Sequence, residues 1–453
     1  MLNWAPPTDR SGKPRYLELA DAIARDVTAG RLRPGDRLPP QRKLAERLGV
    51  DFTTVSRGYA EARARGLVES HVGRGTFISD ASARIQTREL RRSGDRDLTM
   101  NLPPEPTDPD LLRRMREGLE TVAVNMVDLL RYQSSTGGQV DKEAASSWLS
   151  LRGMVPTLDR VAITPGAHPT IMAILMLLTE PGDCILSEGV SYSGTRGIAA
   201  RLRLQQVGLA EDDEGILPDA LEAAIAAHRP KLLYLNPTLN NPTTRTVSLA
   251  RRQAIAEILL AHDLPLIEDD AYGFIPPHPP APIASMAPGL TWHIGGLAKC
   301  IGAGLRLAYT VAPSARLARD LAQCLKSISV MPSPVSMALA TRWIEDGTAD
   351  QIRRFVRTET SERQKIAARV FEGFTFAADP HAFNIWLTLP EGRSRADVVG
   401  RMAGASIGIM PSDVFTILGT PTEALRVCLG GEIDRPRLED GLGQLAHILQ
   451  SDY

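Results

Sequence analysis

The sequence has few cysteines and no long apolar run. Its 453 residues include four cysteines, Cys184, Cys300, Cys324 and Cys428, and no two of them form a CxxC pair. This spacing argues against a zinc site and a disulfide framework, so we expect no metal centre and a reducing, cytoplasmic location. The longest apolar run, residues 171–178, is much shorter than the roughly 20 residues of a membrane helix. The first residues lack a basic region followed by an apolar stretch, so no secretion signal is expected.

Lysine is also scarce. Only seven of the 52 basic side chains are lysine. One of them, Lys299, stands in GGLAKCIGAGLRLAY, residues 295–309, among glycines, alanines and aliphatic residues, with Arg306 seven positions later. Because the chain uses arginine at almost every other basic position, arginine would have been the expected residue at position 299. Lys299 is therefore a candidate for chemistry that needs a primary amine. A lysine that reaches solvent from a sheet edge is the structural alternative.

Charge is distributed unevenly along the chain. With 43% hydrophobic and 23% charged residues, the chain has the composition of a soluble globular protein and is too long for one ordinary domain. Residues 1–100 contain 19 Lys and Arg against 13 Asp and Glu, a net charge of +6, and the remaining residues have a net charge of −7. The N-terminal part is therefore expected to prefer an anionic partner.

Three helices and a hairpin are predicted at the N-terminus. Apolar residues recur at helical spacing over residues 16–27, a second helix starts with Pro40 in its first turn, and Asp51 is placed to cap a third. Two short strands then meet at residues 73–75. This order is typical of a winged helix-turn-helix, whose third helix enters the DNA major groove. Periodicity alone leaves a plain three-helix packing unit as the alternative.

Residues 16–79, YLELADAIARDVTAGRLRPGDRLPPQRKLAERLGVDFTTVSRGYAEARARGLVESHVGRGTFIS, resemble the GntR-type DNA-binding domain over nearly their whole length. The resemblance, with the basic wing, implies that the following residues contact double-stranded DNA: Arg42, Thr53, Thr54, Ser56, Arg57, Gly73 and Arg74. Phe52 departs from the polar or basic residue that is common at its position. Phenylalanine is suited to contact with a thymine methyl group instead.

The rest of the chain predicts a linker and an α/β domain. Residues 80–97 are polar and rich in arginine, as in a solvated interdomain linker. Helical stretches then alternate with five strand-like apolar runs: RVAITPG, CILSE, KLLYLNP, LPLIEDDAY and TWHIGG. This alternation indicates a mostly parallel sheet, and ligands of such sheets bind beyond the carboxyl ends of the strands.

Polar groups follow these runs. A helix begins at residues 166–168, and its free N–H groups are suited to hold a phosphate, although a plain strand-to-helix turn explains the same pattern. Tyr192 is able either to stack on a flat ring or to pack in the core. A carboxylate at Asp269, after a buried apolar run, is costly unless it meets a cation.

Pyridoxal 5′-phosphate is a ligand that needs this combination of groups. Its aldehyde forms a Schiff base with a lysine amine, and its pyridine nitrogen needs a carboxylate to stay protonated. Its ring oxygen accepts hydrogen bonds from an amide or a phenol, and its phosphate accepts them from helix N–H groups and an arginine. Lys299, Asp269, Asn241, Tyr272 and Arg306 supply groups of these kinds.

Residues 132–426 resemble the class I aminotransferases, which are pyridoxal phosphate enzymes of fold type I. The resemblance implies a catalytic set in which Lys299 forms the Schiff base, Asp269 pairs with the pyridinium and Tyr272 contacts the ring oxygen. It places Asn241 at the ring oxygen as well, and Tyr192 at the ring-stacking position. It further implies a phosphate site of Gly166, Ala167, His168 and Arg306, a tyrosine from the partner subunit at Tyr132, and a carboxylate site at Arg426.

Some positions depart from the aminotransferase pattern. Gly296 and Ala298 stand where hydroxyl residues often precede the lysine, and Thr244 replaces a common glycine. The sequence HPT at residues 168–170 replaces the more common polar continuation of the phosphate loop. These changes leave the Schiff base intact and weaken the expectation of efficient catalysis.

A GntR-type domain joined to an aminotransferase-like domain resembles a MocR-type transcriptional regulator. That resemblance implies a homodimer, often head to tail with exchanged domains, that senses pyridoxal phosphate or an amino acid or amine. The ligand would regulate DNA binding if it bound the dimer more tightly in one spacing of the DNA-binding domains than in the other. Two alternatives stay open: a working pyridoxal phosphate-dependent aminotransferase with a DNA-binding arm, and a DNA-binding protein whose second domain is only a dimerisation scaffold.

The expected fold is therefore multidomain. We expect a winged helix-turn-helix over residues 1–79, a linker over 80–97 and an α/β aminotransferase-like domain of fold type I over 98–453. The sequence does not identify the operator, the target genes, the effector or the sign of regulation.

Overall fold

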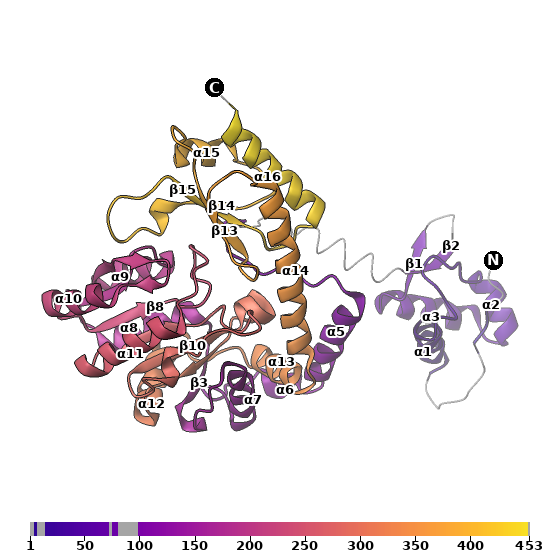
Figure 1. Ribbon diagram of the computed structural model, residues 1–453. Coiled ribbons are helices and arrows are strands. Elements are labelled where there is room, and N and C mark those ends of the chain that lie inside the picture. The colour runs from indigo at the N-terminus through magenta and orange to yellow at the C-terminus, as the bar shows by residue number, and fades with distance from the viewer. Residues whose placement is uncertain (1–3, 7–13, 72–74, 80–97, 452–453) are drawn as a thin grey trace. The chain divides into compact units, whose positions relative to one another are not determined.

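The computed structural model describes residues 4–6, 14–71, 75–79 and 98–451. The chain divides into two units, Met1–Arg96 and Asp97–Tyr453. Figure 1 shows the elements of each unit. The linker expected over residues 80–97 and the wing residues Gly73 and Arg74 lie outside the described residues.

The described residues of the first unit form three helices followed by an antiparallel hairpin: α1 (Arg15–Thr28), α2 (Gln41–Leu48), α3 (Phe52–Ala64), β1 (Val68–His71) and β2 (Gly75–Ile78). Asp51 caps α3 as expected, because its carboxylate accepts a hydrogen bond of 2.7 Å from the backbone N–H of Thr53. Pro40 stands at the N-cap of α2, one position before the first turn where we expected it. The order of elements is that of the predicted winged helix-turn-helix.

Helices α1 and α3 approach closely at Gly58. A Cβ atom at this position would lie 2.7 Å from Cδ2 of Leu19, so a larger residue would force the Leu19 side chain to shift. Ile23, Val55 and Tyr59 are buried in the same core, and the Tyr59 hydroxyl donates a hydrogen bond of 2.8 Å to the carbonyl of Pro39. This packing fixes the inner face of α3 and leaves its other face to solvent.

The second unit is built on a seven-stranded sheet of order β3-β11-β10-β9-β8-β4-β5. The strands are β3 (Val161–Thr164), β4 (Cys184–Glu188), β5 (Gln205–Leu209), β8 (Leu232–Leu235), β9 (Leu266–Asp269), β10 (Thr291–Gly296) and β11 (Ala308–Val311). Strand β11 is antiparallel to both of its neighbours, and the other pairings are parallel. Five strands coincide with the five predicted runs, whereas β5 and β11 were not predicted.

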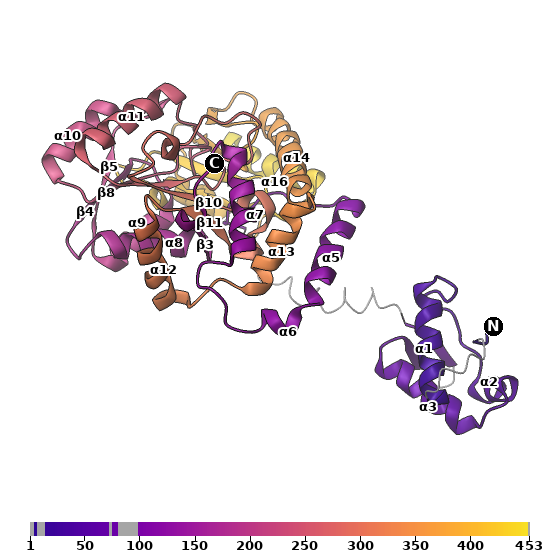
Figure 2. The same ribbon diagram turned by 90° about the horizontal axis from the view of Figure 1, so that it is seen from below.

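Helices cover both faces of this sheet (Figures 1 and 2). On one face pack α8 (Ala167–Leu178), α9 (Ser193–Leu202) and α12 (Ala315–Ser329). On the other face pack α5 (Pro109–Ala123), α7 (Gln139–Leu149), α10 (Pro218–His228), α11 (Leu249–His262), α13 (Pro334–Glu345) and α14 (Thr348–Val370). Because both faces are covered, the central strands are continuous apolar runs, which is why the sequence revealed them.

A smaller antiparallel sheet of order β12-β13-β15-β14 follows α14. Its strands are β12 (Phe376–Ala377), β13 (Asn384–Thr388), β14 (Ile409–Pro411) and β15 (Ala424–Cys428), and α15 (Arg395–Arg401) and α16 (Arg435–Gln450) pack against it. The unit also contains shorter elements, among them α6 (Met126–Leu129), β6 (Glu211–Asp212) and β7 (Gly215–Ile216). Among the described helices, none is both long enough and apolar enough to cross a membrane.

Candidate functional site

The carboxyl ends of the parallel strands border a cavity of about 310 Å³ in the second unit. A lining residue follows or ends each of five strands: Gly166 after β3, Tyr192 after β4, Asn236 after β8, Asp269 on β9 and Gly296 on β10. Ligands of open α/β sheets bind at this edge. The topology thus gathers residues that are far apart in the sequence.

Most of the pocket residues expected from the sequence line this cavity: Gly166, Ala167, His168, Tyr192, Asn241, Asp269, Tyr272, Lys299, Arg306 and Arg426. Tyr132 is not among the lining residues, and its side chain is 86% exposed. Within one chain Tyr132 therefore takes no part in the cavity.

Lys299 lies directly after β10, in a single π-helical turn, η4 (Ala298–Gly302). Its Nζ donates a hydrogen bond to the backbone carbonyl of Asn101 and lies 5.7 Å from the centre of the Tyr272 ring. Burial lowers the pKa of Lys299 to about 8, and the positive charge of Arg426 acts in the same direction. A lowered pKa gives this lysine more of the nucleophilic free amine at neutral pH than an exposed lysine has.

Asp269 ends β9 and is 6% exposed. Its Oδ2 accepts a hydrogen bond of 2.9 Å from the Tyr234 hydroxyl, while its Oδ1 is buried without a hydrogen-bond partner in the described part of the chain. Burial raises the pKa of Asp269 to about 6, and the hydrogen bond from Tyr234 opposes that rise. A buried carboxylate with one unsatisfied oxygen is suited to a cationic N–H donor such as a pyridinium.

The N-terminus of α8 borders the cavity beside Arg306. Gly166 has φ +103°, and a Cβ atom on it would lie 3.2 Å from Nη2 of Arg306, so the guanidinium lies against the glycine backbone. The Tyr192 hydroxyl lies 3.3 Å from Nδ1 of His168. Burial and the charge of Arg306 lower the pKa of His168. A helix N-terminus beside an arginine is suited to hold a phosphate.

Arg426, on β15, also lines the cavity. Its Nη1 donates a hydrogen bond of 2.9 Å to Oδ1 of Asn241, and its Nη2 donates one to the carbonyl of Thr99. Its Nε is buried and has no hydrogen-bond partner in the described part of the chain. The guanidinium carbon lies 5.0 Å from the centre of the Phe415 ring. A buried guanidinium with an unused donor is suited to a carboxylate.

Sequence reasoning missed two residues that support Asp269. Tyr234 lies on β8 and holds the carboxylate, as described above. Asn236 follows β8, donates a hydrogen bond of 2.7 Å to the backbone carbonyl of Asp269, and accepts one of 2.8 Å from the backbone N–H of Asn241. Its position after the run KLLYL is the signal that would have revealed Asn236.

Asn101 and Asn384 were also missed. The Asn101 amide donates hydrogen bonds of 3.0 Å both to the Tyr272 hydroxyl and to Oδ1 of Asn384. The Asn384 amide donates one of 2.7 Å to the carbonyl of Pro242. No local pattern marks either asparagine, because their partners are more than one hundred residues away in the sequence.

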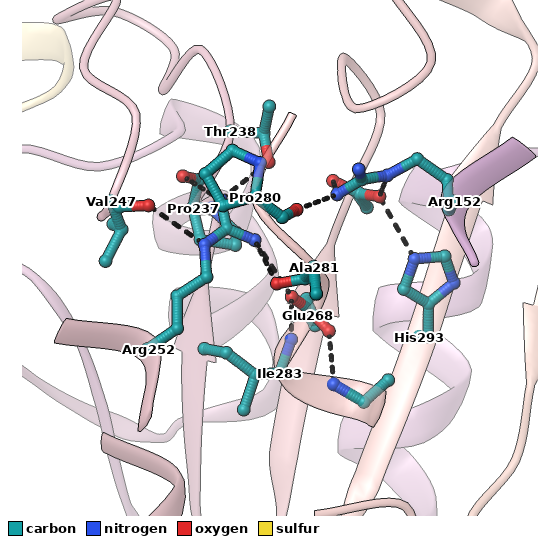
Figure 3. A network of polar contacts seen from close by, with 12 residues as sticks. Arg152, Pro237, Thr238, Val247, Arg252, Glu268, Pro280, Ala281, Ile283 and His293 are labelled. Carbon is teal, nitrogen blue, oxygen red and sulfur yellow. Dashed lines mark hydrogen bonds and ion pairs between the residues drawn. The ribbon is translucent and has the colours of Figure 1, made fainter. Parts of the chain in front are cut away.

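A buried ionic network supports β9 from the other face of the sheet (Figure 3). Arg152 donates a hydrogen bond of 2.6 Å to Asp270, and Nε2 of His293 lies 3.2 Å from the same carboxylate oxygen. Arg152 and His293 together hold the pKa of Asp270 well below its ordinary value. Glu268 accepts the backbone N–H groups of Ile283 and Ala284, each at 2.8 Å. The neighbours of Asp269 on both sides are thus fixed.

In the first unit, the residues expected to contact DNA lie on α2 and α3. Arg42 and Arg57 are exposed, and their guanidinium groups lie 5.9 Å from the Phe52 ring centre and 4.4 Å from the Tyr16 ring centre. Thr53 is exposed, while Thr54 and Ser56 are partly exposed on the same helix. Five of the seven expected residues are thus at least partly exposed to solvent, and the other two lie outside the described residues.

Comparison with known proteins identifies both units. A family model described as "Aminotransferase class I and II" matches residues 96–443, and one described as "Bacterial regulatory proteins, gntR family" matches residues 15–78. The HTH-type transcriptional regulator YdeF of Bacillus subtilis (strain 168) is 29% identical, with 99% of this chain and 97% of that protein covered. PtsJ of Salmonella typhimurium, a vitamin B6 salvage pathway transcriptional repressor, is 25% identical, with 91% of this chain and 93% of PtsJ covered.

A solved structure agrees with this fold. The α-aminoadipate aminotransferase LysN from Thermus thermophilus, complexed with N-(5′-phosphopyridoxyl)-L-leucine, superposes with a TM-score of 0.71 at 21% identity, covering 82% of this chain and 97% of LysN. This likeness shows that the second unit has the aminotransferase fold. The chain therefore belongs to the class I and II aminotransferase family, and its gntR-family domain gives it the domain order of a MocR-type transcriptional regulator.

Proposed function

We propose that this protein is a transcriptional regulator that binds operator DNA through its first unit and pyridoxal 5′-phosphate through its second. The observation that carries the proposal is the meeting of Lys299, Asp269 and Arg426 at one cavity. Each has a property that such a ligand would use. The Lys299 amine has a lowered pKa. Oδ1 of Asp269 and Nε of Arg426 are buried without hydrogen-bond partners in the described part of the chain. The similarity to PtsJ, which is named for vitamin B6 salvage, supports the same ligand.

Bound pyridoxal phosphate would supply an aldehyde that reacts with primary amines. Lys299 would hold it covalently through Nζ, and Oδ1 of Asp269 would accept the pyridinium N–H. The helix N-terminus at Gly166 and the guanidinium of Arg306 would hold the phosphate. Arg426 would hold the carboxylate of an amino acid effector.

We further propose that ligand binding alters the spacing of two DNA-binding units in a homodimer. A ligand shifts an equilibrium only by its differential affinity for the two arrangements. A cytoplasmic location is part of the same proposal, because operator DNA is there.

Cofactor titration tests the proposal. Adding pyridoxal phosphate to the purified chain is expected to produce the visible absorbance of a lysine-bound cofactor, and Lys299→Ala is expected to abolish it. Lys326→Ala, at an exposed lysine on α12, is the matched control. The affinity for DNA from upstream of the protein's own gene, measured by fluorescence anisotropy, should change with the cofactor in the control and not in Lys299→Ala. Equal DNA affinity and transcription in both variants, under every effector tried, would contradict the sensing role.

A working aminotransferase is the second candidate. The unused Nε of Arg426, beside Lys299 and Asp269, favours it, because an amino acid substrate needs a carboxylate site. Steady-state transamination between an amino donor and a keto acid, at ordinary enzyme rates of about 1–1000 per second, would favour this candidate over a purely sensory role. A chain that stays colourless with added cofactor would favour a dimerisation scaffold.

Exposed apolar side chains support a homodimer. The stretch from the end of α5 through α6 exposes Val124 by 83%, Val127 by 72%, Leu130 by 74% and Tyr132 by 86%. Four strongly exposed apolar or aromatic side chains within nine residues are typical of an interaction surface, although Asn125, Asp128 and Arg131 are exposed among them. We propose that a second copy covers it and that Tyr132 reaches the phosphate end of the partner's cavity.

A further inference from the structure

The first described residues of the second unit enter the candidate cavity. Thr99, Met100 and Asn101 are lining residues, and they follow directly on the segment that leads from the DNA-binding unit. The Thr99 carbonyl accepts a hydrogen bond from Nη2 of Arg426. The Asn101 carbonyl accepts one from Nζ of Lys299. The two cationic groups assigned above to the effector and the cofactor thus both hold this one segment.

Further contacts fix the segment against the small sheet. A Cβ atom on Gly408 would lie 1.5 Å from the Leu98 carbonyl oxygen, and one on Gly430 would lie 1.7 Å from the Leu102 carbonyl oxygen, so backbone lies directly on backbone. The Gly431 N–H donates a hydrogen bond of 3.0 Å to the carbonyl of Pro103. The position of residues 98–103 is therefore specific rather than incidental.

The Asn101 side chain is the polar anchor of the segment. It is 3% exposed, and its amide donates two hydrogen bonds of 3.0 Å, to Tyr272 and to Asn384. Leu98 and Met100 beside it are 41% and 54% exposed, so their side chains contribute much less to the position of the segment.

A carboxylate ligand would compete with this segment for Arg426. A guanidinium binds a carboxylate best through two parallel N–H donors. Nη1 of Arg426 donates to Asn241, and Nη2 donates both to the Thr99 carbonyl and to Sδ of Met410. Both N–H groups of Nη2 are therefore in use, and the adjacent Nε is buried without a partner in the described part of the chain. A charged carboxylate is a stronger acceptor than a neutral carbonyl. Two-point binding therefore favours displacement of Thr99.

We propose that residues 99–101 are an internal competitor for the ligand cavity, displaced from Arg426 by a carboxylate effector and from Lys299 by the cofactor. This inference rests on the proposed function and adds its route: occupancy of the cavity frees the segment through which the second unit is joined to the DNA-binding unit. Segment release and ligand binding are then linked, so each favours the other by the same factor.

Hydrogen exchange of the full-length chain tests the inference. Pyridoxal phosphate is one probe, and butyrate, a carboxylate without an amino group, is the other. Butyramide has nearly the same shape without the charge and is the control for butyrate. We expect the amides of residues 98–102 to exchange several-fold faster with pyridoxal phosphate or butyrate, and to be unchanged with butyramide.

Two pairs of variants sharpen the test. Asn101→Ala removes both anchoring hydrogen bonds, so release should become roughly 10-fold more favourable and the butyrate affinity should rise accordingly. Leu98→Ala, at an exposed side chain of the same segment, should change neither quantity. Gly408→Ala should also free the segment, whereas Gly400→Ala, whose added Cβ meets nothing within 4 Å, is its matched control.

The outcomes separate this inference from the proposed function. If the visible absorbance shows that pyridoxal phosphate binds, but the amide hydrogen exchange of residues 98–102 stays constant, the competitor hypothesis is wrong. The proposed function then still stands. If butyrate does not bind to the Asn101→Ala variant, the competitor hypothesis is also wrong. Failure of the cofactor to bind at all overturns both. Faster exchange with both probes, together with tighter butyrate binding by Asn101→Ala and Gly408→Ala, supports it.

Discussion

At the scale of the residue, burial sets the chemical state of Lys299. Its pKa of about 8 leaves roughly one tenth of the side chains as free amine at pH 7. The rate of pyridoxal phosphate capture should therefore rise about tenfold per pH unit below pH 8 and level off above it. Stopped-flow absorbance measures this profile.

Substitution of Arg426 tests whether its charge contributes to the lowered pKa of Lys299. Because this neighbouring positive charge lowers the pKa of Lys299, Arg426→Gln should move the midpoint of the profile to higher pH. A midpoint that stays near pH 8 would mean that the guanidinium does not act on the amine.

Asp269 gives a second prediction at this scale. Its pKa of about 6 reflects burial, opposed by the hydrogen bond from Tyr234. Tyr234→Phe removes that hydrogen bond, so the pKa should rise by up to about one unit and less of the carboxylate should be ionised at pH 7. We expect cofactor affinity to fall about two- to fivefold at pH 7 and to recover at higher pH. Tyr309→Phe, at another buried tyrosine of the sheet, should not change the affinity.

At the scale of the element, the close approach of α1 and α3 is the feature most sensitive to substitution in the first unit. Gly58→Val would force a side chain into Leu19, and overpacking of this kind costs about 1–3 kcal/mol of folding free energy. We expect a lower melting temperature of that unit by circular dichroism and weaker DNA binding. Ala60→Val, at an exposed position of α3, controls for the β-branched side chain. Normal DNA binding by Gly58→Val would show that the contact is dispensable.

Elements differ in how well the sequence predicted them, and burial explains part of the difference, since β11 was missed although it is buried at every position. Strands β4, β8 and β9 are buried at every position, so they read as continuous apolar runs. Strand β5 begins with exposed and half-buried residues, and its sequence, QQVGL, has no such run. The small sheet was missed as well, because its short antiparallel strands have weak local signals.

At the scale of the whole molecule, the exposed apolar stretch around α6 predicts self-association. Leu130→Glu places a charge where we propose that a second copy packs, so it should weaken the dimer by at least tenfold in dissociation constant, because an unpaired buried charge is costly. Analytical ultracentrifugation measures this change. Leu260→Glu, at a 55% exposed leucine on α11, is the control. A wild-type chain that sediments as a monomer at micromolar concentration would contradict the proposal.

The sequence by itself determined the order of the two units, the caps and strands with strong local patterns, and ten of the residues that line the candidate pocket. Lys299, Asp269 and Arg306 could be selected because their local surroundings make such side chains costly or unusual. Only the tertiary structure decided which distant groups meet them. Asn101 contacts Lys299 across 198 residues of sequence, and Arg426 holds Thr99 across 327. Contacts between backbone carbonyls and distant side chains leave no periodic trace in a sequence, because they depend on how the seven-stranded and the four-stranded sheets of the second unit pack and not on local conformation.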